Sequence, residues 1–573
     1  MTQAFSESPA AESIIQRFSV SAASHLGYRP RAVQIDAASR LMGRVIVEMA
    51  TGEGKTLSLA LAASLIASTG RRVCVATAND YLAHRDAHWM RPLYTDLGLT
   101  VGNVATDHST PQRSQSYQRD VAYGTIREFA FDHLRAAMAA RRQQPIDASP
   151  TLDVLIVDEA DSVLIDEART PLVISSPEKG LDPADEATLR WAANVAGTFH
   201  DSHDFVRCDP GGMIALTTSG RQRVLHLQMP PAMGPLSMTD IIHRLEIAIW
   251  INQTMYAGQQ YIIRDGKVSI IHEYTGRASQ QRMFGAGVHQ AIEAREGLKI
   301  TPPNQPIARI TVQDFTDLFA HVSGVTATAR EDQNELVQVY QLPVEVIPSH
   351  RPCQRKIHAA CVCRDEPTKW QRIAEETMEM IQAGRAVLIG TRSVQQSEAL
   401  SQVLRQCGVE HVVLNARHFD REAEIVAQAG NPARVTVATN MAGRGTDIEL
   451  SDAVRQAGGL HVIVSEAHAA SRIDRQLFGR CARQGDPGTA RLFVCPDDEV
   501  LLLGLGPARY GRTRQSYLAT SDSRGLLSQL VRAQRLVSRQ QRLGRSALTA
   551  HQSQLNSVLQ NLGLDPQLDP LPE

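Results

Sequence analysis

A glycine-rich segment, Thr51-Gly52-Glu53-Gly54-Lys55-Thr56, constrains the fold of this chain more than any other feature. An apolar run at residues 45–49 precedes it and predicts a buried strand. An alanine- and leucine-rich stretch at residues 57–67 follows it and predicts a helix. A strand that leads through a glycine-rich loop into a helix is the context of a phosphate-binding P-loop. The segment therefore predicts a parallel α/β fold with a nucleotide site.

The alternation of short apolar strands with helical stretches occurs twice and is interrupted once. The first occurrence has strands at residues 72–77 and 153–157, and the second has them at 386–390, 435–439 and 461–464. Such alternation predicts parallel sheets with crossover helices. Between about 177 and 304 this rhythm is lost, and Asp265-Gly266 between two β-rich runs predicts a hairpin. We expect two α/β lobes with parallel sheets and an inserted mixed α+β module.

The last part of the chain differs from both lobes. Residues 524–563 contain no Asp or Glu, and their leucines and valines fall mostly at helical spacing. They predict one long helix or a helical pair, interrupted near Gly544. Five arginines at steps of three and four predict a basic helical face, which is either solvated or in contact with anionic lipid or a membrane channel. They are Arg532, Arg535, Arg539, Arg542 and Arg545.

Two carboxylates at the end of a strand complete the expected nucleotide site. Asp158 and Glu159 follow the apolar run Leu155-Ile156-Val157. With a P-loop, Asp158 would hold the Mg²⁺ shell together with Thr56, and Glu159 would orient and deprotonate the attacking water. Lys55 would neutralise phosphate charge. Gln34 lies 21 residues before Lys55, and its amide suits the donor–acceptor edge of adenine.

The second α/β segment carries arginines suited to the same chemistry. Arg480 and Arg483 lie three residues apart in a Gly/Gln/Asp-rich frame, on one face of a predicted helix. Reaching across a cleft between lobes, they would act as arginine fingers on the γ-phosphate. The segment 441–447 of the same lobe contains a further arginine and a carboxylate, Arg444 and Asp447.

Charge, cysteines and termini exclude several other classes. The net charge of −2 argues against nucleic acid as the main partner. The eight cysteines form no CxxC pair, so no zinc site is predicted. The N-terminus lacks the pattern of a signal peptide, and no apolar run reaches the length of a membrane-spanning helix. We expect a cytoplasmic protein that could still reach a membrane surface.

In its motifs the chain resembles superfamily 2 helicase-type motors and, more narrowly, the SecA family of translocation ATPases. The resemblance runs from about Gly27 to about Asp498. It is carried by the runs at 49–57, 79–86, 157–172, 272–277, 425–430 and 438–448.

The resemblance implies two RecA-like lobes and a set of further parts and partners. Residues 1–176 with 305–345 would form the first nucleotide-binding lobe, and residues 346–500 the second. Residues 177–304 would form the preprotein cross-linking domain, and 501–573 a shortened helical scaffold. Gln34 would contact adenine, and Arg444 and Asp447 would face the nucleotide. The implied ligands are ATP and Mg²⁺, and the implied location is the cytoplasm, with peripheral association at the cytoplasmic face of the inner membrane. The implied partners are unfolded preprotein and a SecYEG-like channel, with anionic lipid and a second copy of the chain as further candidates.

The chain departs from the family pattern in places. Phe478 stands where the family has Arg, Cys481-Ala482 where it has Ser-Gly, and Ala327 where it has Gly. These changes touch the coupling between the lobes and keep both finger arginines. After the second lobe the expected wing, two-helix finger and cysteine-rich tail have no counterpart.

Three functions stay open from the sequence. The first is an ATP-driven motor for protein export. The second is a nucleic-acid helicase of superfamily 2, which the two lobes alone would allow. The third is an accessory polypeptide-binding ATPase that does not translocate by itself.

Overall fold

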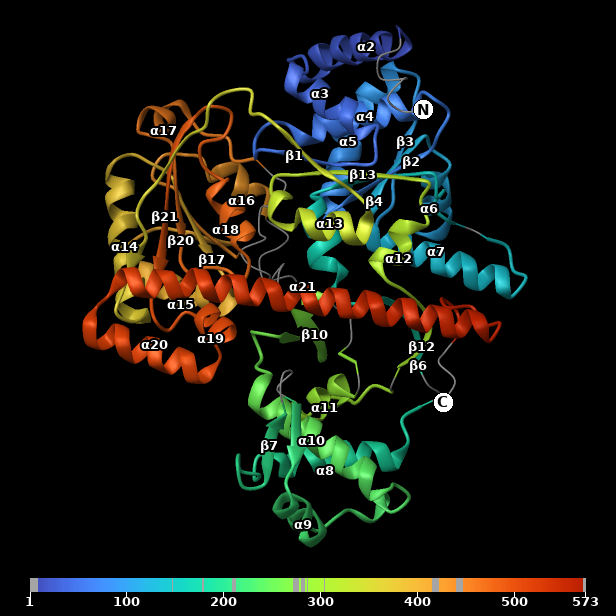
Figure 1. Cartoon of the computed structure of the whole chain (residues 1–573), viewed down its shortest axis with the longest axis vertical. Helices are drawn as coiled ribbons and strands as arrows, with labels where there is room; N and C mark the ends of the chain where they lie inside the picture. The colour runs from blue at the N-terminus through green and yellow to red at the C-terminus, as the bar shows by residue number, and fades with distance from the viewer. Residues whose placement is uncertain are drawn as a thin grey trace.

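The computed structural model describes residues 9–146, 148–177, 180–208, 213–271, 278–279, 284–285, 287–302, 304–414, 422–439 and 447–569. Two α/β lobes lie side by side, a smaller module lies below them in the view of Figure 1, and one long helix crosses the lobes. No described helix is long and apolar enough to span a membrane.

The first lobe is built on a seven-stranded sheet with the order β14-β1-β13-β5-β2-β4-β3, in which every pairing is parallel. Its strands are β1 (Ile46–Met49), β2 (Val73–Thr77), β3 (Val101–Asn103), β4 (Val121–Thr125), β5 (Val154–Asp158), β13 (His321–Thr326) and β14 (Val344–Ile347). Its helices are α2 (Pro9–Leu26), α3 (Ala32–Leu41), α4 (Lys55–Ala67), α5 (Asp80–Asp96), α6 (Thr110–Tyr117), α7 (Ile126–Arg141), η1 (Ser162–Asp166), η2 (Glu167–Arg169), α12 (Val312–Asp317), η4 (Arg330–Asp332) and α13 (Gln333–Tyr340).

The burial of this sheet explains its apolar strands. β2, β5 and β13 are buried at every position, as parallel strands covered on both faces must be. β1 and β5 both pair with β13, so their carboxyl ends meet at one edge of the sheet. That edge is where ligands of open α/β sheets bind. β14 pairs with β1 and ends at Ile347, two residues beyond the limit of 345 expected for this lobe.

The inserted module leaves and rejoins the first lobe through an antiparallel pair, β6 (Leu172–Pro177) and β12 (Asn304–Ile310). It contains α8 (Pro183–Ala196), β7 (Phe205–Cys208), β8 (Met213–Leu216), α9 (Thr218–His226), η3 (Pro231–Met233), α10 (Met238–Thr254), β9 (Tyr261–Arg264), β10 (Lys267–Ile271), β11 (Ala278–Ser279) and α11 (Val288–Arg295). Asp265 and Gly266 both have positive φ and join the antiparallel strands β9 and β10, which confirms the predicted hairpin.

The second lobe repeats the parallel architecture of the first. Its sheet has the order β15-β21-β20-β17-β19-β18, with β16 paired to β21. The strands are β15 (Gln354–Ile357), β16 (Cys361–Val362), β17 (Val387–Thr391), β18 (Val412–Leu414), β19 (Val435–Thr439), β20 (Leu460–Val464) and β21 (Pro487–Val494). The helices are α14 (Glu366–Gln382), α15 (Val394–Gln406), α16 (Glu422–Gln428), α17 (Asp452–Gln456) and α18 (Ser471–Phe478). The α/β fold with two parallel-sheet lobes is therefore confirmed.

The C-terminal part is helical, with α19 (Glu499–Leu505), α20 (Pro507–Thr520) and the 39-residue α21 (Ser523–Asn561). The predicted interruption near Gly544 is wrong, because α21 runs through that residue. A single glycine costs a helix about 1 kcal/mol, and packing of one apolar face outweighs it. The buried residues of that face include Leu530, Val537 and Leu559. Figure 1 shows α21 lying across both lobes.

Candidate active site

The P-loop lies between β1 and α4, as the sequence predicts. Gly52 and Gly54 have φ values of 85° and 81°, a region that residues with a Cβ rarely adopt. Gly54 is also the residue before α4, and a Cβ there would collide with the amide nitrogen of Gln34. Lys55 is the first residue of the helix, so its side chain starts at the end where backbone N–H groups point outward.

Gln34 lies under the P-loop and is not among the residues that line the cavity described below. It is buried, its Nε2 donates to the carbonyl oxygen of Glu53 at 2.8 Å, and its Oε1 accepts from the backbone of Arg31 at 2.8 Å. Glu53 is buried too, and its carboxylate accepts from the backbone of His350 at 3.3 Å. The side chains of Gln34 and Glu53 therefore stabilise the P-loop and do not line the cavity.

Asp158 and Glu159 stand at the carboxyl end of β5, facing the P-loop. Glu159 has a positive φ of 51°, a strained conformation that is common at functional sites. Its Oε1 lies 3.9 Å from Lys55 Nζ, and its backbone donates to Asp158 Oδ1 at 2.9 Å. Burial raises the pKa of Asp158 to about 7, with Glu159 and Asp86 adding to the effect and Lys55 opposing it. The positive charge of Lys55 is therefore too little to offset burial and the neighbouring carboxylates, which favour the protonated form of Asp158.

The second lobe brings arginines to the same place. The prediction that Arg480 and Arg483 share one helical face is wrong, because α18 ends at Phe478 and Ala482 and Gln484 adopt positive φ, so both arginines lie in the turn after the helix. Gly479 follows α18, and its carbonyl accepts a hydrogen bond from Thr51 Oγ1 at 2.7 Å. A Cβ on Gly52 would lie 2.8 Å from the Cβ of Arg483. Arg483 Nη1 pairs with Asp447 at 2.7 Å. Burial acts to raise the pKa of Asp447, but this guanidinium, together with hydrogen bonds from Gln484 and the backbone of Ile448, lowers it. Arg444, the other predicted residue of this segment, lies outside the described residues.

A cavity of about 590 Å³ joins these groups. The first lobe contributes Thr51, Gly52, Gly54, Lys55, Thr56, Asp158 and Glu159 to its lining, and the second contributes Asp447, Arg480 and Arg483. Ten of the predicted residues thus meet in one space between the lobes. Two half-exposed aromatics that the sequence reasoning missed, Tyr28 and Trp89, also line it. Aromatic rings of this kind offer a flat surface for a base.

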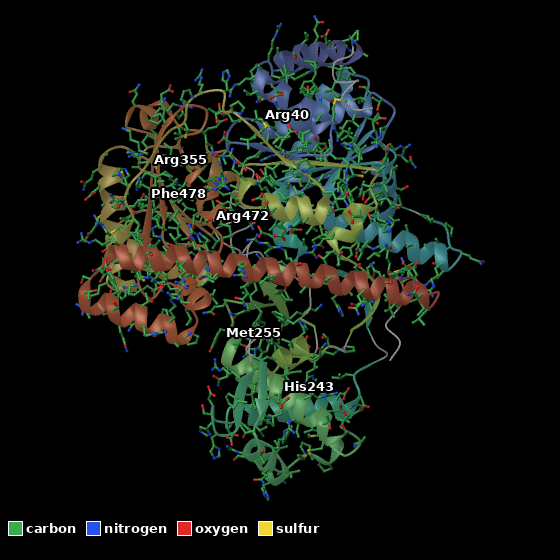
Figure 2. All side chains as sticks on the ribbon, viewed as in Figure 1. Arg40, His243, Met255, Arg355, Arg472 and Phe478 are labelled. Carbon is green, nitrogen blue, oxygen red and sulfur yellow. The ribbon has the colours of Figure 1, made fainter. Side chains whose placement is uncertain are left out.

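The departures from the family pattern lie close to this cavity. Ala327 is part of the lining. Ala482 has a φ of 54°, in the left-handed region where a glycine is unstrained and an alanine is not. Phe478 packs half-buried against the core of the second lobe. Phe478 and Arg472 are both labelled in Figure 2, with Arg472 at the border between the lobes.

A buried polar network behind the cavity is the largest feature that the sequence reasoning missed. Asp161 accepts hydrogen bonds from Thr326 at 2.6 Å and Thr328 at 2.8 Å, and from Gln476 across the lobes. Arg472 of the second lobe reaches Asp161 at 3.3 Å and also pairs with Asp166 and Asp332. The signal available in the sequence was a second pair of acids, Asp161 and Asp166, soon after Asp158 and Glu159.

The donor set at the cavity fits a magnesium ion bound with a nucleotide. Thr56 and Asp158 both line the cavity, and hydroxyl and carboxylate oxygens are the ligands that Mg²⁺ takes in such sites. Burial and the nearby carboxylates Glu159 and Asp86 disfavour the charged form of Asp158, so a cation bound there would be favoured by the local charge. Among the described residues, no cluster of three His, Cys, Asp or Glu is placed to hold a metal by itself.

Comparison with known proteins places both lobes in one family. A family model described as the SecA DEAD-like domain matches residues 3–337, and one described as the SecA P-loop domain matches residues 352–454 and 451–508. The chain is 40% identical to protein translocase subunit SecA 2 of Rhodopirellula baltica, over 95% of this chain and 87% of that protein. It is 39% identical to SecA 2 of Magnetococcus marinus, over 93% and 84%.

Other matches are more partial. The chain is 42% identical to protein translocase subunit SecA of Syntrophobacter fumaroxidans, over 83% of this chain and 56% of that protein, so it spans about half of that relative's length. Among solved structures, the DEAD-box helicase Mss116 bound to ssRNA and UDP-BeF is similar with a TM-score of 0.45 and 10% identity, covering 86% of this chain and 75% of that one.

Proposed function

The chain belongs to the SecA family, and from this premise we propose that it is an ATPase that couples ATP hydrolysis to the binding and movement of unfolded preproteins. The observation that carries the proposal is the cavity between the lobes, lined by Lys55, Glu159 and Arg483. Each lobe contributes groups that the other lacks, so hydrolysis depends on how the lobes meet.

The chain's own residues have distinct roles in this reaction. Lys55 and the N-terminus of α4 bind the phosphates, and Glu159 orients a water and takes its proton as the water attacks the γ-phosphorus. The bond from the γ-phosphorus to the bridging oxygen breaks in the same step, and ADP leaves with that oxygen. Mg²⁺, held with the nucleotide by Thr56 and Asp158, supplies positive charge to the phosphates. Arg480 and Arg483 stabilise the charge that develops on the γ-phosphoryl oxygens. Tyr28 and Trp89 offer surfaces for the base.

Coupling to movement follows from how the inserted module is attached. The module is attached to the first lobe through β6 and β12. It contacts the second lobe where the side chain of Gln259 donates a hydrogen bond to the side chain of Gln395. A change in the angle between the lobes would therefore press the module toward the second lobe or draw it away. We propose that unfolded polypeptide binds between them and that a membrane channel receives it at the cytoplasmic face.

The test is an ATPase assay on the purified chain, with and without membranes that contain the channel and with a signal-bearing preprotein. We expect basal hydrolysis that Lys55→Ala abolishes together with nucleotide binding, and stimulation by preprotein. Stimulation by RNA and not by preprotein would favour a helicase instead. Movement of preprotein into vesicles by this chain alone would separate a motor from an accessory ATPase.

Anionic lipid is a further proposed partner, through α21. Arg532, Arg535, Arg539 and Arg542 are exposed on this helix, and each contributes about 1 kcal/mol near an anionic surface. Arg545 does not belong to this face, since it is buried against Glu335. Changing the four exposed arginines to Glu should abolish co-sedimentation with anionic vesicles. Unchanged sedimentation would remove lipid from the set of partners.

A further inference from the structure

A second cavity, of about 310 Å³, lies at the outer edge of the first lobe between α5, β3 and α6. β3 is the last strand of its sheet, and α6 lies on the side of the lobe away from the second lobe (Figure 1). None of the proposed ATPase chemistry uses this cavity.

One face of α5 gives the cavity its chemistry. His84, His88 and Arg91 are spaced by four and three residues, so they lie on the same side of the helix, and all three line the cavity. The imidazole rings of His84 and His88 are stacked, with their centroids 6.4 Å apart. Arg85 and Trp89, one position further along, line the nucleotide cavity instead. The two cavities thus use different faces of one helix.

The opposite wall adds more donors and no carboxylate. His108 and Arg119 line it together with Asn103, and no Asp or Glu is among the described residues of the lining. The carboxylate of the neighbouring Asp120 accepts hydrogen bonds from Thr100 instead. The Thr100 hydroxyl donates at 2.6 Å and its backbone N–H donates at 2.7 Å. Within the described part of the chain, neither Arg91 nor Arg119 has a carboxylate within salt-bridge distance. Two guanidinium groups therefore face a space that holds no counter-charge.

Two buried nitrogens in this lining have no hydrogen-bond partner in the described part of the chain. They are Asn103 Nδ2 and His108 Nδ1. Buried polar atoms in folded proteins are nearly always paired, and an unpaired one calls for a water, an ion or a ligand. An amide nitrogen is a donor, so what it lacks is an acceptor. A ligand rich in acceptor oxygens supplies one.

We propose that this cavity binds the phosphate group of an anionic ligand. Arg91 and Arg119 would pair with its oxygens, because guanidinium groups match the geometry of phosphate. The histidines would donate ring N–H groups, which even a neutral imidazole can do. A divalent cation fits less well: His84 and His88 have a spacing that metals use, but the two arginines would repel it. Among the described residues, no set of three metal-ligating side chains is in place.

The experiment uses the full chain carrying Lys55→Ala, so that the P-loop does not compete for phosphate. Inorganic pyrophosphate is titrated calorimetrically without added metal. We expect one binding step, weakened at least about tenfold by Arg91→Gln with Arg119→Gln, since two charged donors are lost. His84→Gln with His88→Gln should weaken it by a smaller factor. The matched control removes two exposed arginines elsewhere, Arg142→Gln with Arg221→Gln, and should change nothing.

Some outcomes would overturn the proposal. One is a titration with no binding step, and another is a step that Arg91→Gln with Arg119→Gln leaves unchanged. Binding of Zn²⁺ that His84→Gln with His88→Gln removes, with no binding of pyrophosphate, would make this a cation site instead.

A second arm separates the sources of the phosphate. The chain is sedimented with phosphatidylcholine vesicles that contain or lack phosphatidic acid. Loss of phosphatidic-acid-dependent binding in the Arg91 and Arg119 variant identifies a lipid headgroup as the ligand. If the Arg91 and Arg119 variant sediments as the unmodified chain does but no longer binds pyrophosphate, the ligand is a soluble phosphate compound.

Discussion

Thr51 Oγ1 donates a 2.7 Å hydrogen bond to the carbonyl oxygen of Gly479, so the P-loop of one lobe is bonded directly to the arginine-bearing turn of the other. The bond joins the phosphate-binding loop directly to the turn that carries Arg480 and Arg483. It also makes the contact between the lobes sensitive to whatever occupies the loop.

Replacing Thr51 by Val keeps the side-chain shape and removes this donor. Loss of one such hydrogen bond costs about 1 kcal/mol, so the closed arrangement of the lobes should be about fivefold less populated. Energy transfer between dyes on the two lobes would measure the closed fraction. Thr51→Ser keeps the hydroxyl and should match the unmodified chain. Equal closure in the Val and Ser variants would mean that the bond does not hold the lobes together.

Arg483→Gln should slow ATP hydrolysis by about a thousandfold, the usual effect of losing an arginine finger. Nucleotide affinity should fall much less, because the finger acts on charge that develops during the reaction. Arg475→Gln is the matched control, since this exposed arginine of α18 pairs with Glu331 at 2.8 Å. Similar losses of kcat in both variants would assign Arg483 a structural role. The measurement is steady-state hydrolysis alongside nucleotide binding.

The raised pKa of Asp158 predicts that the stability of the chain depends on pH when no nucleotide or metal is bound. Its pKa is about 7 in the folded chain against an ordinary value of 3.8, so between these values the folded state binds more protons than the unfolded state. The contribution of Asp158 to the free energy of unfolding is therefore present at acid pH and is lost as the pH rises toward 7. Asp158→Asn should gain stability relative to the unmodified chain over this window, measured by thermal melting. A constant difference would contradict the buried, uncompensated carboxylate.

Arg545 and Glu335 form a buried ion pair between α21 and α13, with N–O distances of 2.5 Å and 2.7 Å. Removing one partner of a buried pair costs about 3–5 kcal/mol, because the other charge stays buried alone. Arg545→Met should therefore raise hydrogen exchange along α21. The exposed Arg542→Met should have almost no effect, and Arg545→Met with Glu335→Met should restore much of the protection. Protection unchanged in Arg545→Met would show that the pair does not dock the helix.

The parts of the fold that follow local rules were predictable. Buried parallel strands and the Asp265-Gly266 hairpin depend on residues close in sequence, and so does the P-loop between β1 and α4. The meeting of Lys55 with Arg483 was inferred from motifs, since 428 residues separate them and no local rule places them together.

The misses have physical reasons as well. Gly544 is a weak helix former, yet tertiary packing along α21 overrides its propensity. Arg545 shares a periodic spacing with four exposed arginines, and only the position of Glu335 on another helix buries it. Tyr28 and Trp89 carry no motif, so only the folded lobe reveals them as lining residues.

Single-turnover hydrolysis of ATP by Glu159→Gln tests the catalytic site between the lobes most directly. The Gln side chain keeps the size of Glu159 and cannot take a proton from water. ATP affinity should stay close to that of the unmodified chain, and hydrolysis should be at least about a hundredfold slower. The exposed Glu366→Gln of α14 should behave as the unmodified chain. Hydrolysis by Glu159→Gln at an undiminished rate would contradict the catalytic site described between the two lobes.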